Sequence, residues 1–378
     1  MTRHMFVLWS PSAVCFFVNG AIYGTWATQV PIAKERLAVS DAHFGLLLLA
    51  MGVGAISAMI ASGSLIPRYG TARLITYGLA AFLLSAIGLA IAGTPVSFAC
   101  ALFAFGASGG MMDAAMNANA AEAESQIGRP VMSSIHGMWS IGGVVSSALG
   151  GAMLSVMPGP WQAATICAAL LVLFLAVRSR LSSVRLSRKG EPIRGRRTLG
   201  MVWLIGGLAG LCFSAEGSVR DWSSLYFSRE LVAPLSVAGW GYSAFSALMA
   251  AGRFGGDWIR SHIGERMLVT ACGTVAGVGF VLTAVTSDYP IAVAGFSLVG
   301  IGLSNIVPIF ISVAGRSINS AASISIVVAM GYSGFLISPP ILGAVAGLTS
   351  LATMFLLVGA MSMLIALTWA FIPVRPTK

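Results

Sequence analysis

The sequence predicts an all-α integral membrane protein with twelve transmembrane helices, and three observations lead to this fold class. Of the 378 residues, 57% are hydrophobic and only 9% are charged, whereas a soluble domain carries about 25% charged residues. The same hydrophobicity excludes a disordered chain. The apolar stretches are also continuous, whereas the strands of a transmembrane β-barrel alternate apolar and polar residues.

A membrane-spanning helix needs about 20 mostly apolar residues, and twelve apolar runs of this kind lie between polar breaks. The breaks contain proline, glycine or charged residues, as in segments 31–41 and 67–71. The predicted spans are 6–30, 43–66, 73–93, 96–122, 131–156, 160–178, 199–225, 237–256, 265–287, 290–315, 320–346 and 348–372.

The longest hydrophilic stretch, residues 181–198, is basic and divides the chain into two pseudo-symmetric halves of six spans, 1–180 and 199–378. Lys and Arg in short loops mark the cytoplasmic side of a membrane. With the N-terminus inside, 18 of the 22 Lys and Arg residues lie in inner segments and 4 in outer loops. We therefore expect a multi-pass membrane protein with both termini in the cytoplasm.

The formal net charge of +10 also allows a second interpretation, which is binding to nucleic acid. The basic run at 178–197 is flanked by apolar spans, and no hydrophilic domain follows it. We therefore expect no nucleic-acid partner. The expected partners are the lipid bilayer, a small solute and protons, and the expected assembly is a monomer.

Two glycine-rich, basic segments, 63–73 and 252–266, lie at equivalent places in the two halves. Glycines allow helices to approach closely, and the charges can hold the cytoplasmic helix ends together. An ordinary set of basic inner loops is the alternative interpretation. The candidate gating residues are Arg68, Arg73, Arg253, Asp257 and Arg260.

Two six-helix halves with a basic linker resemble the major facilitator superfamily of transporters, and both segments resemble its loop motif. The resemblance implies that the halves are parallel repeats with a substrate site between them near the bilayer midplane. In the first copy, Pro67 stands where the usual aspartate would be. Asp257 in the second copy is therefore the better gate candidate.

Asp113 is an acid deep inside the fourth predicted span. Placing such a side chain in hydrocarbon costs about 2.5–3.5 kcal/mol or more, and a rise of 1.5 Å per residue puts Asp113 about 16 Å from the span end. Asn117 lies one turn away on the same face. Desolvation disfavours the charged carboxylate, so Asp113 could bind and release a proton as a cavity changes sides. A structural hydrogen bond to a neighbouring helix and a direct substrate contact are the alternatives.

His136 lies early in the fifth span, at a depth near that of Asn117. It could relay protons between Asp113 and the cytoplasm, or it could be a core histidine with satisfied hydrogen bonds. Trp139, one turn later, is a candidate substrate contact. The chain has 4 histidines, none of them paired at the spacing of metal ligands, so we expect neither a metal nor a cofactor.

The end of the seventh span carries Glu216, Arg220 and Trp222. Glu216 and Arg220 are one turn apart and could form an ion pair. We take Glu216 as a candidate cavity acid for proton coupling, and Arg220 and Trp222 as candidate substrate contacts. Trp222 also fits the aromatic belt at the outer interface, which is the simpler interpretation.

A polar stripe follows one face of the first span at helical spacing. Amide, phenol and indole groups suit a small polar ligand, although helix packing is the competing interpretation. The tenth and eleventh spans add one candidate each, close to prolines that could permit bending. These substrate-binding candidates are Asn19, Tyr23, Trp26, Gln29, Asn305 and Tyr332, together with Asn117.

Two segments resemble motifs of the fucose:proton symporter family within the superfamily, namely 110–117 in the fourth span and 304–310 in the tenth. By this resemblance, Asp113 falls on the family's protonatable acid. Those symporters carry a second acid late in the first span, where this chain has Ala27, so Glu216 is the candidate replacement. The segments around His136, Glu216 and Tyr332 resemble most closely a poorly characterised bacterial inner-membrane subgroup.

The leading functional hypothesis is a secondary active transporter, and not an enzyme, that moves a small polar solute such as a sugar by alternating access. Proton-coupled symport through Asp113 would drive it. Proton-driven efflux of an amphipathic compound is the alternative within the same fold. A polytopic membrane enzyme would need a convergent acid, base or metal cluster, which the sequence does not show.

Overall fold

The computed structural model describes residues 11–127, 132–181, 196–315 and 320–372, and these residues form helices without any strand. Two short 3₁₀ turns, η1 (Arg178–Arg180) and η2 (Leu235–Val237), lie in connections. The α-helices are α2 (Pro11–Leu37), α3 (Asp41–Tyr69), α4 (Thr71–Ile91), α5 (Pro95–Ile127), α6 (Met132–Leu154), α7 (Gly159–Val177), α8 (Arg196–Arg229), α9 (Trp240–Val285), α10 (Tyr289–Leu303), α11 (Ile306–Gly315), α12 (Ser320–Leu348) and α13 (Leu351–Phe371).

These helices supply twelve membrane-crossing segments in the described parts of the chain. Helix α9 turns at Gly264 and crosses twice, whereas α10 and α11 follow each other in a single crossing. Ten of the segments are long and apolar enough to span a bilayer by length and composition alone. Among the others, α2 has a lower hydropathy because it carries buried polar residues such as Asn19 and Gln29. The all-α membrane fold predicted from hydropathy is confirmed.

Two of the predicted breaks are present but begin later in the chain than expected. Pro31 and Pro67 lie inside α2 and α3, which continue to Leu37 and Tyr69. Proline removes only one backbone hydrogen bond, and helices in membrane proteins tolerate that loss where neighbouring groups compensate. The turn after α2 is made instead at Ala38, which has a φ of 50°.

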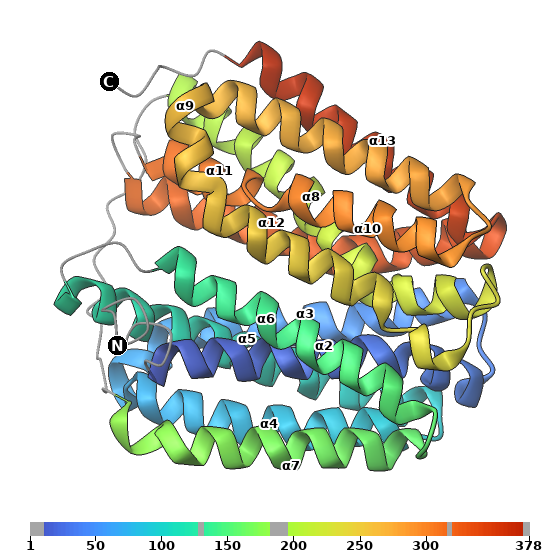
Figure 1. The fold of residues 1–378 in the computed structure, drawn as a ribbon. Helices are drawn as coiled ribbons and strands as arrows, with labels where there is room; N and C mark the ends of the chain where they lie inside the picture. The colour runs from blue at the N-terminus through green and yellow to red at the C-terminus, as the bar shows by residue number, and fades with distance from the viewer. Residues whose placement is uncertain (1–10, 128–131, 182–195, 316–319, 373–378) are drawn as a thin grey trace.

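Helices α2–α7 and α8–α13 form two groups that lie side by side, and all crossings run between the same two ends of the molecule (Figure 1). We call the end at segment 37–41 the distal end, and the end at segment 69–71 the linker end, because α7 ends and α8 begins there. Between the groups, α3 packs along α12 and α6 packs along α9. Residues 182–195 of the predicted linker lie outside the described residues, so the exact division into halves stays a prediction.

The two predicted loop motifs contain the same unusual turn. Gly70 has φ 79° and ψ 156°, and Gly264 has φ 77° and ψ 164°. Only glycine adopts this region readily, because a Cβ atom would clash with the backbone. The equivalent turns between the second and third crossings and between the eighth and ninth therefore agree with an internal repeat.

Helices α2 and α6 approach so closely that there is no room for side chains at their contact. A methyl group on Gly20 would overlap the carbonyl oxygen of Trp139, and one on Gly142 would overlap that of Phe17. Small residues allow this approach in membranes, where packing rather than the hydrophobic effect drives helix association. The contact fixes the positions of the side chains that α2 and α6 present to the interior.

We predict that Gly142→Ala lowers the free energy of unfolding by about 1–3 kcal/mol, because the added methyl group forces the two helices apart. Gly63→Ala is the matched control, since Gly63 is exposed and nothing lies within 4 Å of its Cβ position. The measurement is thermal unfolding of both purified variants in detergent. Equal stability of the two variants would contradict the prediction.

Candidate functional site

Asp113 lies in the middle of α5 and faces the interior between the two helix groups. At a rise of 1.5 Å per residue, it is about 27 Å from the distal start of α5 and about 21 Å from its linker end. Asn117, one turn further, donates from Nδ2 to the Asp113 carboxylate oxygen Oδ1 at 3.2 Å and to its carbonyl oxygen at 2.9 Å. Both side chains are half-buried.

The second carboxylate oxygen of Asp113 binds a residue of the opposite helix group. The Tyr332 hydroxyl on α12 donates to Asp113 Oδ2 at 2.7 Å. The Tyr332 ring stacks on Phe213 of α8, with centroids 5.4 Å apart and an interplanar angle of 23°. Stacking holds the hydroxyl in place, so the Asp113 side chain is a hydrogen-bonded contact between α5 and α12.

His136 extends this chain of hydrogen bonds toward the linker end. Its Nε2 atom lies 3.0 Å from Asn117 Oδ1 and donates to it in the Nε2-protonated tautomer. Phe16 of α2 packs edge-on against the imidazole ring at a centroid distance of 4.7 Å. The structure thus brings together four of the residues singled out in the sequence, in the order Tyr332, Asp113, Asn117 and His136.

Arg220 and Asp221 form a buried ion pair on α8. The guanidinium donates from Nε and Nη2 to the two carboxylate oxygens, both at 2.9 Å, and the two residues are only 8% and 1% exposed. Trp26 of α2 donates to Asp221 Oδ1 at 3.1 Å. The guanidinium carbon lies 5.3 Å from the ring centre of Tyr23 and 4.9 Å from that of Phe335. This pair therefore also joins the two helix groups.

The helical spacing allowed Arg220 to pair with Glu216, but the structure pairs it with its neighbour in sequence. Asp221 was missed as a site residue. The available signal was the adjacent Arg-Asp dipeptide in an apolar span, because opposite charges in hydrocarbon are usually partners. Glu216 is half-buried and makes no hydrogen bond or ion pair among the described residues.

Two further helices contribute polar groups near the centre. Trp139 on α6 donates to Asn19 Oδ1 on α2 at 2.8 Å, and the rings of Trp139 and Tyr23 lie 6.0 Å apart. Among the described residues, Asn19 Nδ2 is buried without a hydrogen-bond partner, and the hydroxyls of Tyr242 and Ser246 on α9 lie beside each other without bonding any other group. Both hydroxyls face Gly143, at 3.4 Å and 3.3 Å from its Cβ position. Sequence reasoning missed Tyr242 and Ser246, which carry no distinctive motif.

Two of the predicted substrate contacts, Gln29 and Asn305, bind groups outside this central cluster. Gln29 donates to Gln162 Oε1 at 2.5 Å and to the Gly159 carbonyl at 2.8 Å, so it joins α2 to α7. Asn305 sits in the break between α10 and α11 and donates to the Gly252 carbonyl at 3.0 Å.

Trp222 is 1% exposed and packs edge-on against Phe44 of α3 at 6.0 Å. The aromatic-belt interpretation of Trp222 is wrong, because a belt residue would face the membrane interface.

The predicted gating residues are only partly connected. Arg260 pairs with Glu265 and donates to Ser312 Oγ at 2.7 Å, and both partners belong to its own helix group. Arg253 reaches across to Ser140 Oγ on α6 at 3.5 Å. Arg68 and Arg73 are exposed and form no ion pair within the described part of the chain. The side chain of Asp257 lies outside the described residues, so a gate at the linker end stays a prediction.

The exposure of the site residues changes along the bundle. Those toward the distal end, including Trp26, Asp221 and Trp222, are almost completely buried. Residues at the centre and toward the linker end keep part of their surface accessible, namely Asp113, Asn117, His136, Trp139, Glu216, Arg253 and Tyr332. The interior is therefore tightly closed on the distal side of the Arg220–Asp221 pair.

We predict that Asp221→Asn lowers the free energy of unfolding by about 3–5 kcal/mol, because it leaves the Arg220 charge buried without its partner. Adding Arg220→Met to this variant should recover most of the loss, since no buried charge then remains. Arg229→Gln on the same helix is the matched control and should cost about 1 kcal/mol or less, because its side chain is 50% exposed. Chemical unfolding in detergent measures all three, and a fully stable Asp221→Asn would contradict the prediction.

Solved structures with the same arrangement of helices belong to known transporters. A variant of the nucleoside transporter NupG superposes with a TM-score of 0.77 at 12% identity, over 96% of this chain and 99% of that protein. The human organic anion transporter MFSD10 (TETRAN) superposes with a TM-score of 0.69 at 15% identity, over 98% of this chain and 100% of that protein. At these identities, the likeness shows the fold alone.

The sequence also has relatives at higher identity. An uncharacterized MFS-type transporter of Yersinia pestis is 34% identical over 348 residues, which are 90% of each chain. The membrane protein MosC of Rhizobium meliloti is 31% identical over 363 residues, 94% of this chain and 88% of that one. The sequence profile of the Major Facilitator Superfamily matches residues 12–323. The chain therefore belongs to the Major Facilitator Superfamily and is a membrane transporter rather than an enzyme.

Proposed function

We propose that this transporter moves a small, polar, uncharged solute by alternating access and that Asp113 couples the movement to protons. The observation that carries the proposal is the 2.7 Å hydrogen bond from Tyr332 to Asp113, because it joins a central carboxylate of one helix group to the other group. A proton that binds at Asp113 changes this contact directly.

The coupling step follows from the hydrogen-bonding capacity of a carboxyl group. An ionised Asp113 accepts strong, charge-assisted bonds from Tyr332 and Asn117. Protonation removes the negative charge and weakens both bonds, which makes it easier for α5 and α12 to separate. Asn117 orients the carboxylate, and His136, whose Nε2 lies 3.0 Å from Asn117 Oδ1, is the titratable group on the linker side that would take up or release the proton, with water carrying it past the amide.

The groups near the centre support a solute that is polar but carries no net charge. The Arg220 guanidinium is already neutralised by Asp221. In the described part of the chain, Asn19 Nδ2 is buried without a partner, and the hydroxyls of Tyr242 and Ser246 have only each other nearby. A buried polar group without a hydrogen bond costs about 1–3 kcal/mol unless water or a ligand binds it. The rings of Tyr23 and Trp139 offer flat apolar faces beside them. A sugar or a nucleoside, with hydroxyls on a ring, has the matching chemistry.

Proton-driven efflux of an amphipathic cation is the second candidate function, and two observations favour it. Glu216 is an interior acid that forms no hydrogen bond or ion pair with any residue the structure describes. The neighbouring aromatic cluster is large, because Tyr23 contacts both Phe82 and Phe105 at centroid distances of 5.2 Å and 5.5 Å. A cation would place its charge near Glu216 and its apolar part on these rings.

We also propose the orientation and location of the protein. The linker end faces the cytoplasm of a bacterial inner membrane, with both chain termini on that side. The support is the excess of Lys and Arg in the segments at this end, 18 of 22 by the predicted topology. A monomer is sufficient for this function, because the proposed site lies within one chain.

We predict that Asp113→Asn abolishes solute accumulation driven by an inward proton gradient but retains exchange of solute across the membrane. The amide keeps the size of the carboxyl group and, like its protonated form, offers one acceptor oxygen and one donor, but it binds no proton. Uptake of external labelled sugars or nucleosides into proteoliposomes supplies the measurement. Asp288→Asn is the matched control, because Asp288 is exposed at the distal end. Uphill accumulation by Asp113→Asn would show that Asp113 is not the coupling site.

We predict that Ser246→Ala and Asn19→Ala each raise the Kd for a hydroxylated solute by about ten-fold or less, because each removes one hydrogen bond of about 0.5–1.5 kcal/mol. Binding of an amphipathic cation should not change in these variants, but it should fall in Glu216→Gln. Equilibrium binding of both compound classes to the three variants distinguishes the two functions. Efflux would be favoured if only Glu216→Gln lost cation binding and if the parent protein bound neither sugars nor nucleosides.

A further inference from the structure

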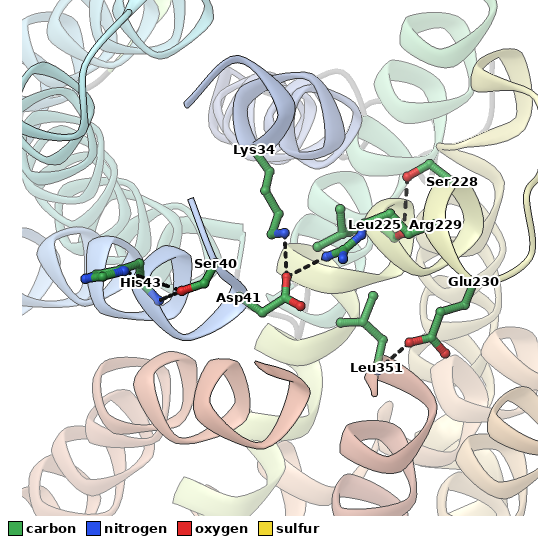
Figure 2. A network of polar contacts seen from close by, with 9 residues as sticks. All are labelled: Lys34, Ser40, Asp41, His43, Leu225, Ser228, Arg229, Glu230 and Leu351. Carbon is green, nitrogen blue, oxygen red and sulfur yellow. Dashed lines mark hydrogen bonds and ion pairs between the residues drawn. The ribbon is translucent and has the colours of Figure 1, made fainter. Parts of the chain in front are cut away.

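At the distal end, one carboxylate is shared by two cations from different helix groups. Asp41 at the start of α3 binds Lys34 Nζ at 2.6 Å and Arg229 Nη1 at 2.7 Å, both through Oδ1 (Figure 2). Lys34 belongs to α2, which is joined to α3 by the turn at 38–40. Arg229 is the last residue of α8 and belongs to the opposite helix group.

Separation of the two helix groups would break one of these ion pairs and leave the other intact. Lys34 and Asp41 lie on consecutive helices and have side chains only 9% and 12% exposed, so their pair moves as a unit. The Arg229 side chain is 50% exposed, so it can leave Asp41 and be solvated by water at little cost. Separation of the groups at this end breaks the pair with Arg229 and leaves the pair with Lys34 intact.

Glu230, the neighbour of Arg229, does not compete for it. The Glu230 carboxylate accepts a hydrogen bond from the backbone amide of Leu351 at the start of α13 (Figure 2). It accepts a second from the backbone amide of Ala352. This contact ties the end of α8 to its own helix group and holds Arg229 in position. Arg229 therefore moves with that group and faces Asp41 only while the distal end is closed.

The distal end is closed by packing around this cluster. A methyl group on Gly45 of α3 would overlap the carbonyl oxygen of Pro339 on α12. On the other side, the hydroxyls of Ser147 on α6 and Ser243 on α9 lie 2.6 Å apart. The ion pair between Asp41 and Arg229 adds an electrostatic contact to these close approaches, and it is the one among them that salt can screen.

We propose that Lys34, Asp41 and Arg229 form a distal latch in which Arg229 stabilises the closed state and Lys34 lowers the cost of leaving it. Lys34 keeps the Asp41 charge neutralised after Arg229 has left, and it repels Arg229 while the latch is closed. Removal of the two cations therefore has opposite effects on the opening equilibrium. The latch needs neither Asp113 nor a particular solute, so it can be tested apart from the proposed coupling.

The experiment measures the distance across the distal end by pulsed electron spin resonance. Spin labels replace Val156 and Leu348, which are 79% and 86% exposed on opposite helix groups, in full-length protein carrying Cys100→Ala to remove the exposed native thiol. Arg229→Gln should raise the ratio of the long-distance to the short-distance population about two- to five-fold, as expected for a part-exposed ion pair. Lys34→Met should not raise this ratio, and should lower it where the parent protein shows a long-distance population.

Two controls separate the latch from a general loosening of the fold. Glu230→Gln changes an acid beside Arg229 that does not bind Asp41, and it should leave the ratio unchanged. Salt at 1 M, where the Debye length is about 3 Å, should shift the parent protein toward the ratio of Arg229→Gln but leave that variant unchanged. A rise in the ratio for Lys34→Met, or no rise for Arg229→Gln, would overturn the proposal.

Discussion

The constraint on which this structure depends is that an ionised or polar group inside a membrane protein needs a partner. Two of the interior acids meet it in different ways. Asp113 accepts hydrogen bonds from Tyr332 and Asn117, whereas Asp221 forms an ion pair with Arg220 and accepts a hydrogen bond from Trp26. In both cases at least one partner comes from the opposite helix group. The same hydrogen bonds that make these acids tolerable therefore also hold the two groups together, so a change of charge and a change of conformation are linked.

The interior becomes less constrained from the distal end toward the linker end. The distal side has close helix contacts and the ion pairs of Asp41, whereas the central residues keep part of their surface accessible. Glu216 lies at this boundary without a protein partner in the described part of the chain. An acid in that position can be completed by water, a proton or a solute, which supports the proposal that transport chemistry takes place at the centre.

The fold and the solute are decided by different parts of the molecule. Similarity to the nucleoside transporter NupG and the organic anion transporter MFSD10 at 12% and 15% identity shows that one arrangement of helices serves transporters of different solutes. Function is determined by the side chains at a site rather than by the fold that carries it. In the proposed site these are the aromatic faces of Tyr23 and Trp139 and the polar groups of Asn19, Tyr242 and Ser246, which come from three different helices.

The sequence by itself determined the membrane class, the number of crossings, the central depth of Asp113 and the repeated glycine turns, because hydropathy, helical rise and backbone conformation are local properties. Only the tertiary structure decided that Arg220 binds Asp221 rather than Glu216, that Tyr332 binds Asp113 and that Arg229 binds Asp41. The tertiary structure also decided that Trp222 is buried and that the side-chain amides of Gln29 and Asn305 bind groups of neighbouring helices. The partner of a side chain depends on which helices pack against each other and through which faces. The spacing of polar residues along one helix shows which residues share a face, but it does not show which helix that face meets.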